Sequence, residues 1–216
     1  MITEHQRSLI ELMNEIQSAP LKEQSSGEQL EQLKKICLSC SLCALRNGCQ
    51  QVVFGEGNPN AHLMLVGEGP GADEDRIGNP FVGRAGQLLD RILEAAEIKR
   101  DQIYIANVVK CRPPANRLPF QTEVDACLPY LKKQIELIDP QLVVCLGALA
   151  TRTLIDKSAS ITHSRGHWYE HGGRRFIATF HPAALLRDPG KKKYVWEDFQ
   201  QVIKYYHYAN DGSYSG

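Results

Sequence analysis

Four short apolar runs, each followed by a polar loop and a helical pattern, constrain the fold of this chain more than any other feature. The runs are "AHLMLVG" (61–67), "QIYIANVV" (102–109), "QLVVCLG" (141–147) and "RFIATF" (175–180). Helical patterns follow them at about 86–98, 122–138, 148–155 and 194–207. Such alternation indicates parallel strands covered by helices on both faces. The sequence therefore predicts an α/β fold, a three-layer α/β/α sandwich with a central, mostly parallel four-stranded sheet.

The length of the chain allows one ordinary globular domain. Its 216 residues are 43% apolar and 23% charged, enough for one well-buried core and too few for two ordinary catalytic domains. We expect an N-terminal helix and linker (1–36), a main domain (37–208) and a flexible tail (209–216). In the first part, residues 2–18 have a helical pattern and residues 18–29 have the composition of a linker.

The sequence carries no signal for export or for membrane insertion. No window approaches the roughly 18 uncharged apolar residues of a transmembrane helix, and the N-terminus lacks the features of a secretory signal. We therefore expect a cytoplasmic protein that makes no membrane contact.

Ligands of parallel sheets bind beyond the carboxyl ends of the strands, so the loops at 67–83, 107–121, 147–150 and 180–190 are the candidate site. The first of them, "GEGPGADED", matches the dinucleotide-binding pattern G-x-G-x-x-A in form. However, we expect the next helix only about fifteen residues later, and three acids stand where phosphates would lie: Asp73, Glu74 and Asp75. The loop is therefore not predicted to bind a phosphate. Its glycines could instead let the backbone approach a flat ligand and direct N–H groups at a negative charge that develops during a reaction.

Seven cysteines are many for a chain in a reducing compartment, and metal binding explains them better than disulfides. The pair Cys40 and Cys43 has C-x-x-C spacing, and Cys111 and Cys127 lie in a second segment. Four thiolates from two segments suit Zn²⁺ or a [4Fe–4S] cluster. Cys37 also makes a C-x-x-C pair with Cys40, which leaves the register open.

The formal net charge is zero, but residues 157–193 carry eight basic side chains against two acidic ones, a net charge of +6. This local excess could bind a polyanion or form a solvated basic face, and charge alone does not choose between them.

Six segments in order along residues 37–190 resemble the family 4 uracil-DNA glycosylases, the iron–sulfur branch of that superfamily. They are "VVFGEGNP", "VGEGPGADED", "NPFVGRAGQLL", "YIANVVKCRPPANR", "ELIDPQLVVCLGA" and "TFHPAALLR". The resemblance implies an α/β/α sandwich and a [4Fe–4S] cluster. The family's spacing to the glycine matching Gly55 implies as ligands Cys40, Cys43, Cys111 and Cys127. Cys37 and Cys49 would then be spare thiols.

The resemblance also implies an activity, hydrolysis of the N-glycosidic bond of uracil in DNA with release of uracil and formation of an abasic site. Residues matching the family's catalytic positions are Glu68, Glu74 and His181. Residues matching those that bind the flipped base are Gly69, Gly71, Phe81 and Asn107. Better-known relatives have a water-activating aspartate where this chain has Gly69, so the group that activates water is left open.

Contacts with uracil-containing DNA are expected from the C-terminal part of the chain. Leu185 and Leu186 are candidates for the wedge that fills the space left by the flipped base. Candidates for phosphate contacts are Arg165, Arg187, Lys191, Lys192 and Lys193. We expect the protein to act as a monomer.

Two other functions fit parts of the same sequence. One is a non-catalytic, iron–sulfur DNA-binding or polymerase-associated module of the same fold, in which "GEGPGADED" and "HPAALLR" hold structure only. The other is a hydrolase of small nucleotides, which would prefer free deoxyuridine nucleotides to DNA.

Overall fold

The computed structural model describes residues 25–210, with side chains up to residue 207. The predicted helix at 2–18 and most of the predicted tail lie outside the described residues. Residues 209 and 210, which were assigned to the tail, belong to the last helix. Within the described residues, no helix is long and apolar enough to cross a membrane.

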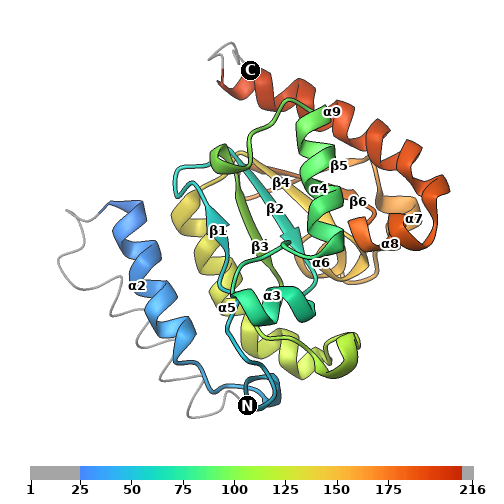
Figure 1. Cartoon of the computed structure of the whole chain (residues 1–216). Coiled ribbons are helices and arrows are strands. Elements are labelled where there is room, and N and C mark those ends of the chain that lie inside the picture. The colour runs from blue at the N-terminus through green and yellow to red at the C-terminus, as the bar shows by residue number, and fades with distance from the viewer. Residues whose placement is uncertain (1–24, 211–216) are drawn as a thin grey trace.

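A single sheet of six strands forms the middle layer, in the order β1-β3-β2-β4-β6-β5 (Figure 1). The strands are β1 (Glu56–Gly57), β2 (Leu63–Gly67), β3 (Tyr104–Asn107), β4 (Leu142–Leu146), β5 (Trp168–His171) and β6 (Arg174–Thr179). The four inner strands pair in parallel and coincide with the four predicted apolar runs. The edge strands β1 and β5 are antiparallel additions that the sequence analysis missed, because β1 is only two residues long and β5 is half exposed.

Helices cover both faces of the sheet, which confirms the predicted α/β class. They are α2 (Ser26–Leu38), α3 (Ala72–Ile77), α4 (Arg84–Ala95), α5 (Gln121–Ile138), α6 (Ala148–Leu154), α7 (Ile161–Ser164), α8 (Pro182–Arg187) and α9 (Lys192–Asn210). Short 3₁₀ turns are η2 (Ala44–Asn47), η3 (Arg100–Gln102), η4 (Pro114–Asn116) and η5 (Pro189–Lys191).

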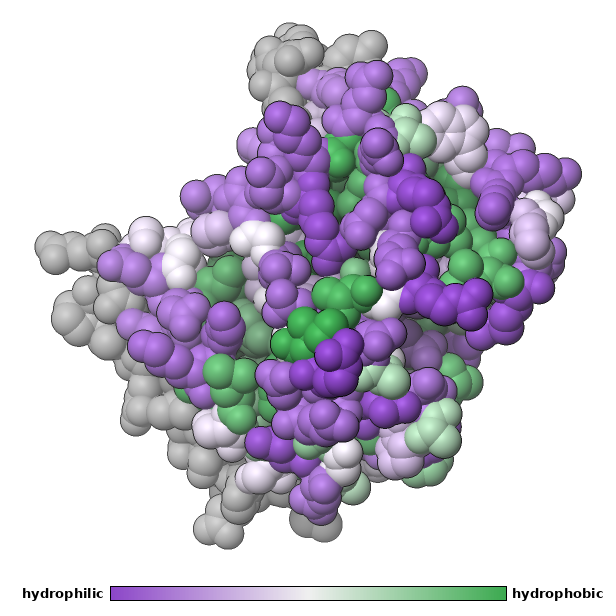
Figure 2. All heavy atoms as spheres, in the orientation of Figure 1, coloured by the Kyte–Doolittle hydropathy of each residue, from purple (hydrophilic) through white to green (hydrophobic). Residues whose placement is uncertain are grey.

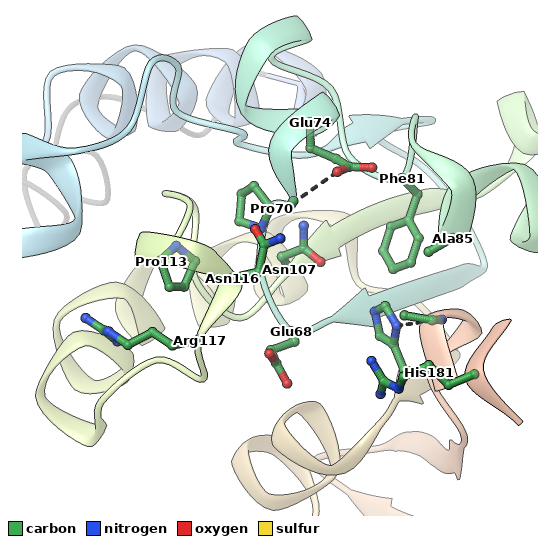
Figure 3. A pocket seen from close by; sticks show the side chains of 14 residues that line it. Glu68, Pro70, Glu74, Phe81, Ala85, Asn107, Pro113, Asn116, Arg117 and His181 are labelled. Atoms are coloured by element: carbon green, nitrogen blue, oxygen red, sulfur yellow. Dashed lines mark hydrogen bonds between the residues drawn. The ribbon is translucent and has the colours of Figure 1, made fainter. Parts of the chain in front are cut away.

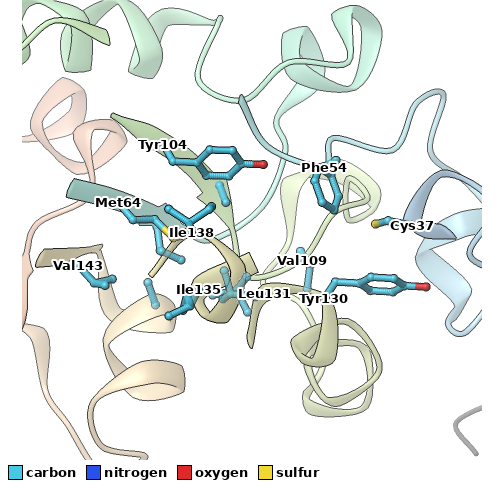
Figure 4. Packing of buried hydrophobic residues seen from close by; sticks show 14 of the residues in the cluster. Cys37, Phe54, Met64, Tyr104, Val109, Tyr130, Leu131, Ile135, Ile138 and Val143 are labelled. Atoms are coloured by element: carbon cyan, nitrogen blue, oxygen red, sulfur yellow. The ribbon is translucent and has the colours of Figure 1, made fainter. Parts of the chain in front are cut away.

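Alternation along the inner strands divides the core in two. On β2, Leu63 and Leu65 belong to the cluster that includes α4 and α9, whereas Met64 and Val66 belong to the cluster that includes α2 and α5. Figure 4 shows the second cluster, in which the strand residues lie at one end and Cys37 lies near Tyr130 at the other. Figure 2 shows that hydrophilic residues cover most of one face of the molecule, as expected for a surface over two buried cores.

Helix α2 corrects the predicted linker and the predicted domain boundary at residue 36. It begins directly after Ser25, whose side chain caps the helix in a reciprocal arrangement with Glu28. Its Leu30 and Leu33 are buried in the core, and the helix lies along α5 (Figure 1). The segment is therefore part of the main domain. The serines and Gly27 favoured a linker, but the S-x-x-E capping box was the better signal.

We predict that Leu33→Ala lowers the free energy of unfolding by about 2–5 kcal/mol, because Leu33 is fully buried between α2 and the core. The control is Lys35→Ala, an exposed position on the same helix, which should change it by less than about 0.5 kcal/mol. Urea denaturation of both variants provides the measurement. Equal stability of the two would mean that α2 is not docked in solution.

Candidate active site

A pocket of about 320 Å³ opens at the carboxyl ends of the parallel strands, where the predicted site loops meet. Figure 3 shows the side chains that line it. They come from the segment between β2 and the start of α4, which includes α3, from the end of β3 and the loop after it, and from the two ends of α8: Glu68, Gly69, Pro70, Gly71, Glu74, Phe81, Ala85, Asn107, Pro113, Asn116, Arg117, His181, Ala183 and Arg187. Every predicted catalytic and base-binding residue is in this set. The remaining predicted loop, 147–150, contributes no lining residue but packs against His181, since a Cβ on Gly147 would lie 2.9 Å from the Cβ of His181.

The glycine turn after β2 leads directly into a helix, which corrects one sequence expectation. Helix α3 begins at Ala72, immediately after the glycines, and not some fifteen residues later. The protein itself supplies the anion at this helix start. The Glu74 carboxylate accepts backbone N–H bonds from Gly71 (3.1 Å), Val82 (2.9 Å) and Gly83 (2.8 Å). It therefore ties the glycine turn to the loop before α4, and its oxygens are already committed.

Phe81 forms one wall of the pocket and is also part of the core. Its side chain is 4% exposed, and its ring stacks on His181 at 5.4 Å between centroids and 29° between planes. Its φ of 53° lies in the left-handed region, which a bulky residue rarely adopts. Gly86 makes room for this backbone, because a Cβ there would lie 1.9 Å from the Phe81 carbonyl oxygen.

Asn107 ends β3 and lies opposite Gly67 in the parallel β2–β3 pair. A Cβ on Gly67 would be 2.4 Å from Asn107 Oδ1 and 2.6 Å from the Phe81 ring, so the glycine lets the two side chains share the pocket floor. Asn107 is 2% exposed, and its Oδ1 has no hydrogen-bond partner. Such a group costs free energy when buried, about 1–3 kcal/mol, unless a ligand pairs with it.

His181 is the N-cap of α8, and its tautomer follows from that position. Its Nδ1 accepts a hydrogen bond from the Ala183 N–H (3.2 Å), so the ring proton of the neutral form sits on Nε2 (Figure 3). Burial, assisted by the charge of Arg187, lowers the pKa of His181 to about 4. The side chain is therefore a neutral hydrogen-bond donor at physiological pH.

Glu68 is the pocket carboxylate that makes no hydrogen bond within the described part of the chain. It follows β2 directly and is half-buried. Burial raises the pKa of the Glu68 carboxyl, while the charges of Arg152 and Arg187 oppose the shift. A carboxylate with a raised pKa is a stronger base than an exposed one and is better able to accept a proton.

The sequence analysis missed the loop residues Asn116 and Arg117, which line the pocket opposite α8. Arg117 pairs with both carboxylate oxygens of Glu123 (2.7 and 2.8 Å), and its guanidinium lies 3.8 Å from the ring centre of Phe120. Both residues end the segment "YIANVVKCRPPANR", one of the six that resemble the family. Their place in that segment could have identified them as site residues.

The two leucines predicted to form the wedge point in different directions on α8. Leu185 is 2% exposed and packs in the core with α4 and α9, so the wedge prediction is wrong for Leu185. Leu186 is 39% exposed, next to the pocket residue Arg187. Consecutive helical residues point about 100° apart, so only one of the two leucines can face outward.

Arg165 has a partner other than the predicted phosphate. Its guanidinium binds the buried carboxylate of Asp198 through Nη2 (2.6 Å) and Nε (3.1 Å), and the carbonyl of Tyr194 (2.6 Å). Asp198 also accepts the hydroxyl of Thr179. Arg165 therefore neutralises a buried acid that joins α9 to the sheet, and the structure does not support it as a DNA contact.

The basic segment 157–193 does not form one patch. Arg174 pairs with Asp139 and Arg175 with Glu170, at the end of the sheet away from the pocket. The remaining candidates end α8 or follow it in the chain: Arg187, Lys191, Lys192 and Lys193. Of these, Arg187 lines the pocket, and Lys191 pairs with Asp188 (3.2 Å).

Five cysteines line one hollow beside the pocket, between α2, the loop after β3, and α5: Cys37, Cys40, Cys43, Cys111 and Cys127. The four predicted ligands are in this set. Within residues 25–210, no three Cys, His, Asp or Glu side chains converge closely enough to hold a single metal ion. The thiol of Cys49 instead donates to the carbonyl oxygen of Arg46 (3.7 Å).

Comparisons with a family model and with individual known proteins point to the same family. Residues 54–201 match the model of the uracil DNA glycosylase superfamily. A type-4 uracil-DNA glycosylase of Thermotoga maritima is 44% identical over 81% of this chain and 93% of its own length. One of Sulfurisphaera tokodaii is 43% identical over 81% and 84%. A DNA polymerase of Bacillus phage SP01 is 33% identical over 68% of this chain but 16% of its own length.

We predict that Glu74→Ala lowers the free energy of unfolding by about 2–4 kcal/mol, because three backbone N–H groups lose a charged acceptor. Asp73→Ala is the matched control: this exposed acid only faces Arg76 at 3.6 Å, and its loss should cost less than about 0.5 kcal/mol. Thermal and urea unfolding measure both. A Glu74 variant as stable as the Asp73 variant would disprove the tie between the two loops.

Proposed function

We propose that the chain, which belongs to the type-4 branch of the uracil-DNA glycosylase superfamily, excises uracil from DNA in the pocket between Phe81, Asn107 and His181. The reaction is hydrolysis of the N-glycosidic bond, a step of DNA repair. Water adds to C1′ of the deoxyribose, the bond from C1′ to uracil N1 breaks, and its electron pair leaves with the base. The products are free uracil and an abasic site.

The unpartnered Oδ1 of Asn107 is the observation that carries this proposal. A carboxamide can accept the N3–H of uracil and donate from Nδ2 to O4. Cytosine has an acceptor at N3 and a donor at its exocyclic amine, so both contacts would be reversed and left unpaired. The pocket floor is therefore suited to uracil and unsuited to cytosine.

His181 is proposed to stabilise the departing base. Negative charge develops on the uracil oxygens as the glycosidic bond breaks, and a fixed donor at that place lowers the barrier. The neutral ring with its proton on Nε2 is such a donor, and it also stacks against Phe81. Phe81 would in turn stack on the flipped base, which must leave the helix to reach the pocket.

Glu68 is proposed as the base that takes the proton from the attacking water. Its carboxylate has no hydrogen-bond partner among residues 25–210, whereas that of Glu74 is held by three backbone groups. We therefore assign Glu74 to positioning of the Gly69–Gly71 turn. A carboxylate beside C1′ would also stabilise the positive charge that develops on the sugar.

The DNA strand is proposed to lie over α8 and the segment that follows it. Leu186 would enter the space vacated by the uracil, and the side chains of Arg187 and Lys191 to Lys193 would contact phosphates without reading sequence. A monomer in the cytoplasm remains the expected form and location.

A [4Fe–4S] cluster held by Cys40, Cys43, Cys111 and Cys127 is proposed for the cysteine hollow. The donor set fits, because all four thiols line one space and come from two segments of the chain. Four cysteine thiolates are the usual ligands of such a cluster. When bound, the cluster would cross-link the segment after α2 to the loop that follows Asn107.

A non-catalytic DNA-binding module is the second candidate. The observation in its favour is the match to a small part of a phage DNA polymerase. Under this alternative, Oδ1 of Asn107 would not pair with a base.

We predict that the holoprotein releases uracil from a labelled oligonucleotide, giving strand breaks after alkali. Asn107→Ala and His181→Ala should each slow release about 10²–10³-fold, because each removes a fixed polar contact to the base. Lys157→Ala, an exposed basic residue outside the pocket, is the control and should keep the full rate. Absence of cleavage by the holoprotein would favour the binding module.

We also predict a pH dependence that belongs to Glu68. Because its carboxyl has a raised pKa, the rate should fall on the acid side, at a higher pH than an exposed glutamate would give, as the carboxylate becomes protonated. Glu68→Gln should lower the plateau about 10²-fold or more and flatten this acid limb. His181→Ala should keep the limb, since His181 stays neutral down to a pH of about 4. Single-turnover rates from pH 4.5 to 8 test this, and an unchanged limb in Glu68→Gln would refute the assignment.

A further inference from the structure

A fully buried lysine lies between the cysteine hollow and the base-reading asparagine, and the proposed reaction gives it no role. Lys110 is 1% exposed, lies three residues after Asn107 and directly precedes Cys111. Its Nζ donates to the backbone carbonyl oxygen of Asn107 (2.9 Å) and to Oε1 of Gln134 (2.5 Å). It also lies 5.9 Å from the ring centre of Phe54.

The position of this amine is determined by surrounding groups. Gln134 presents Oε1 to Lys110 because its Nε2 donates to the Phe54 carbonyl (2.9 Å) and faces the Tyr104 hydroxyl (3.3 Å). The backbone of Lys110 is held as well, since its carbonyl accepts the N–H of Val53 (2.7 Å). Hydrogen bonds therefore fix both the ammonium group and the backbone of Lys110.

Lys110 differs from the other buried lysine in its charge partners. Lys133 forms an ion pair with Glu136 (2.7 Å), whereas no carboxylate contacts Lys110 among the described residues. A buried ammonium without a counter-charge is costly. Lys110 instead lines the same hollow as the five cysteines, so the thiolates of a metal centre bound there would be its nearest negative groups. The backbone N–H of Lys110 also donates to Cys127 Sγ (3.2 Å).

We propose that Lys110 is a positioning residue that couples the cysteine centre to uracil recognition: its ammonium balances the charge of the thiolates, and its hydrogen bond fixes the backbone of Asn107. The inference rests on the proposed [4Fe–4S] centre and glycosylase site. The negative charge of the centre would hold the ammonium in place, and the ammonium would hold the carbonyl of the residue whose Oδ1 meets the base.

Two measurable effects follow from removal of this charge and donor. A nearby positive charge favours the reduced, more negative state of an iron–sulfur centre, so its loss lowers the reduction potential. Loss of the bond to the Asn107 carbonyl loosens the amide that reads the base. Uracil excision should then slow roughly three- to tenfold, the range expected for one hydrogen bond.

The test compares Lys110→Met with Lys133→Met in holoprotein. Both changes remove a buried ammonium of similar length, but only the first lies at the cysteine centre. For Lys110→Met we expect retained iron, a more negative potential in a spectroscopic redox titration, and slower uracil release. Lys133→Met should leave potential and rate as in the unchanged protein. An unchanged potential in iron-loaded Lys110→Met would overturn the proposal.

Lys110→Arg keeps the charge and covers the case in which Lys110→Met does not hold iron. Iron retained in the arginine variant but lost in the methionine variant would support charge balance. Loss from both would overturn the proposal, because packing and not charge would then be the cause. A wild-type protein without iron or without uracil release would instead refute the proposed function on which the inference rests.

Discussion

The parallel pairing of β2 with β3 is the constraint on which the site depends, because it sets Gly67 directly opposite Asn107. Both strands are buried on both faces, so their register is fixed by two cores at once. The missing side chain of Gly67 then leaves space in which the Asn107 amide and the Phe81 ring lie side by side. A methyl group at this one position would occupy the place of both. The register of the sheet therefore determines where the Asn107 amide lies in the pocket.

Two anchored segments complete the pocket around that pair. On one side the Glu74 carboxylate joins the glycine turn to the loop carrying Phe81. These hydrogen bonds help to hold Phe81 in its unfavourable left-handed backbone conformation. On the other, the start of α8 orients His181 through the Ala183 N–H and sets its tautomer. Backbone hydrogen bonds thus position both His181 and the loop that carries Phe81, which is how a site keeps its groups fixed before the substrate arrives.

The sequence predicted the inner sheet and the location of the site because both depend on local signals. Apolar runs identify buried strands, and parallel strands bring the loops after them to one edge; this placed Glu68, Asn107 and His181 together before any coordinates. The failures concern features that only tertiary contacts decide. The burial of Leu185 depends on the packing of α8 against α4 and α9. The engagement of Arg165 depends on Asp198, 33 residues away in the chain. The importance of Lys110 depends on Gln134 and on cysteines of two segments. None of these pairings has a sequence spacing that could reveal it.

The unpartnered oxygen of Asn107 is the proposed point of uracil recognition, on which the function of the pocket depends. A crystal structure of the holoprotein soaked with free uracil tests this most directly. We expect the base to stack on Phe81, with N3 within hydrogen-bond distance of Asn107 Oδ1 and a uracil oxygen facing Nε2 of His181. Uracil bound elsewhere, or bound in this pocket with Asn107 Oδ1 still unpaired, would contradict it.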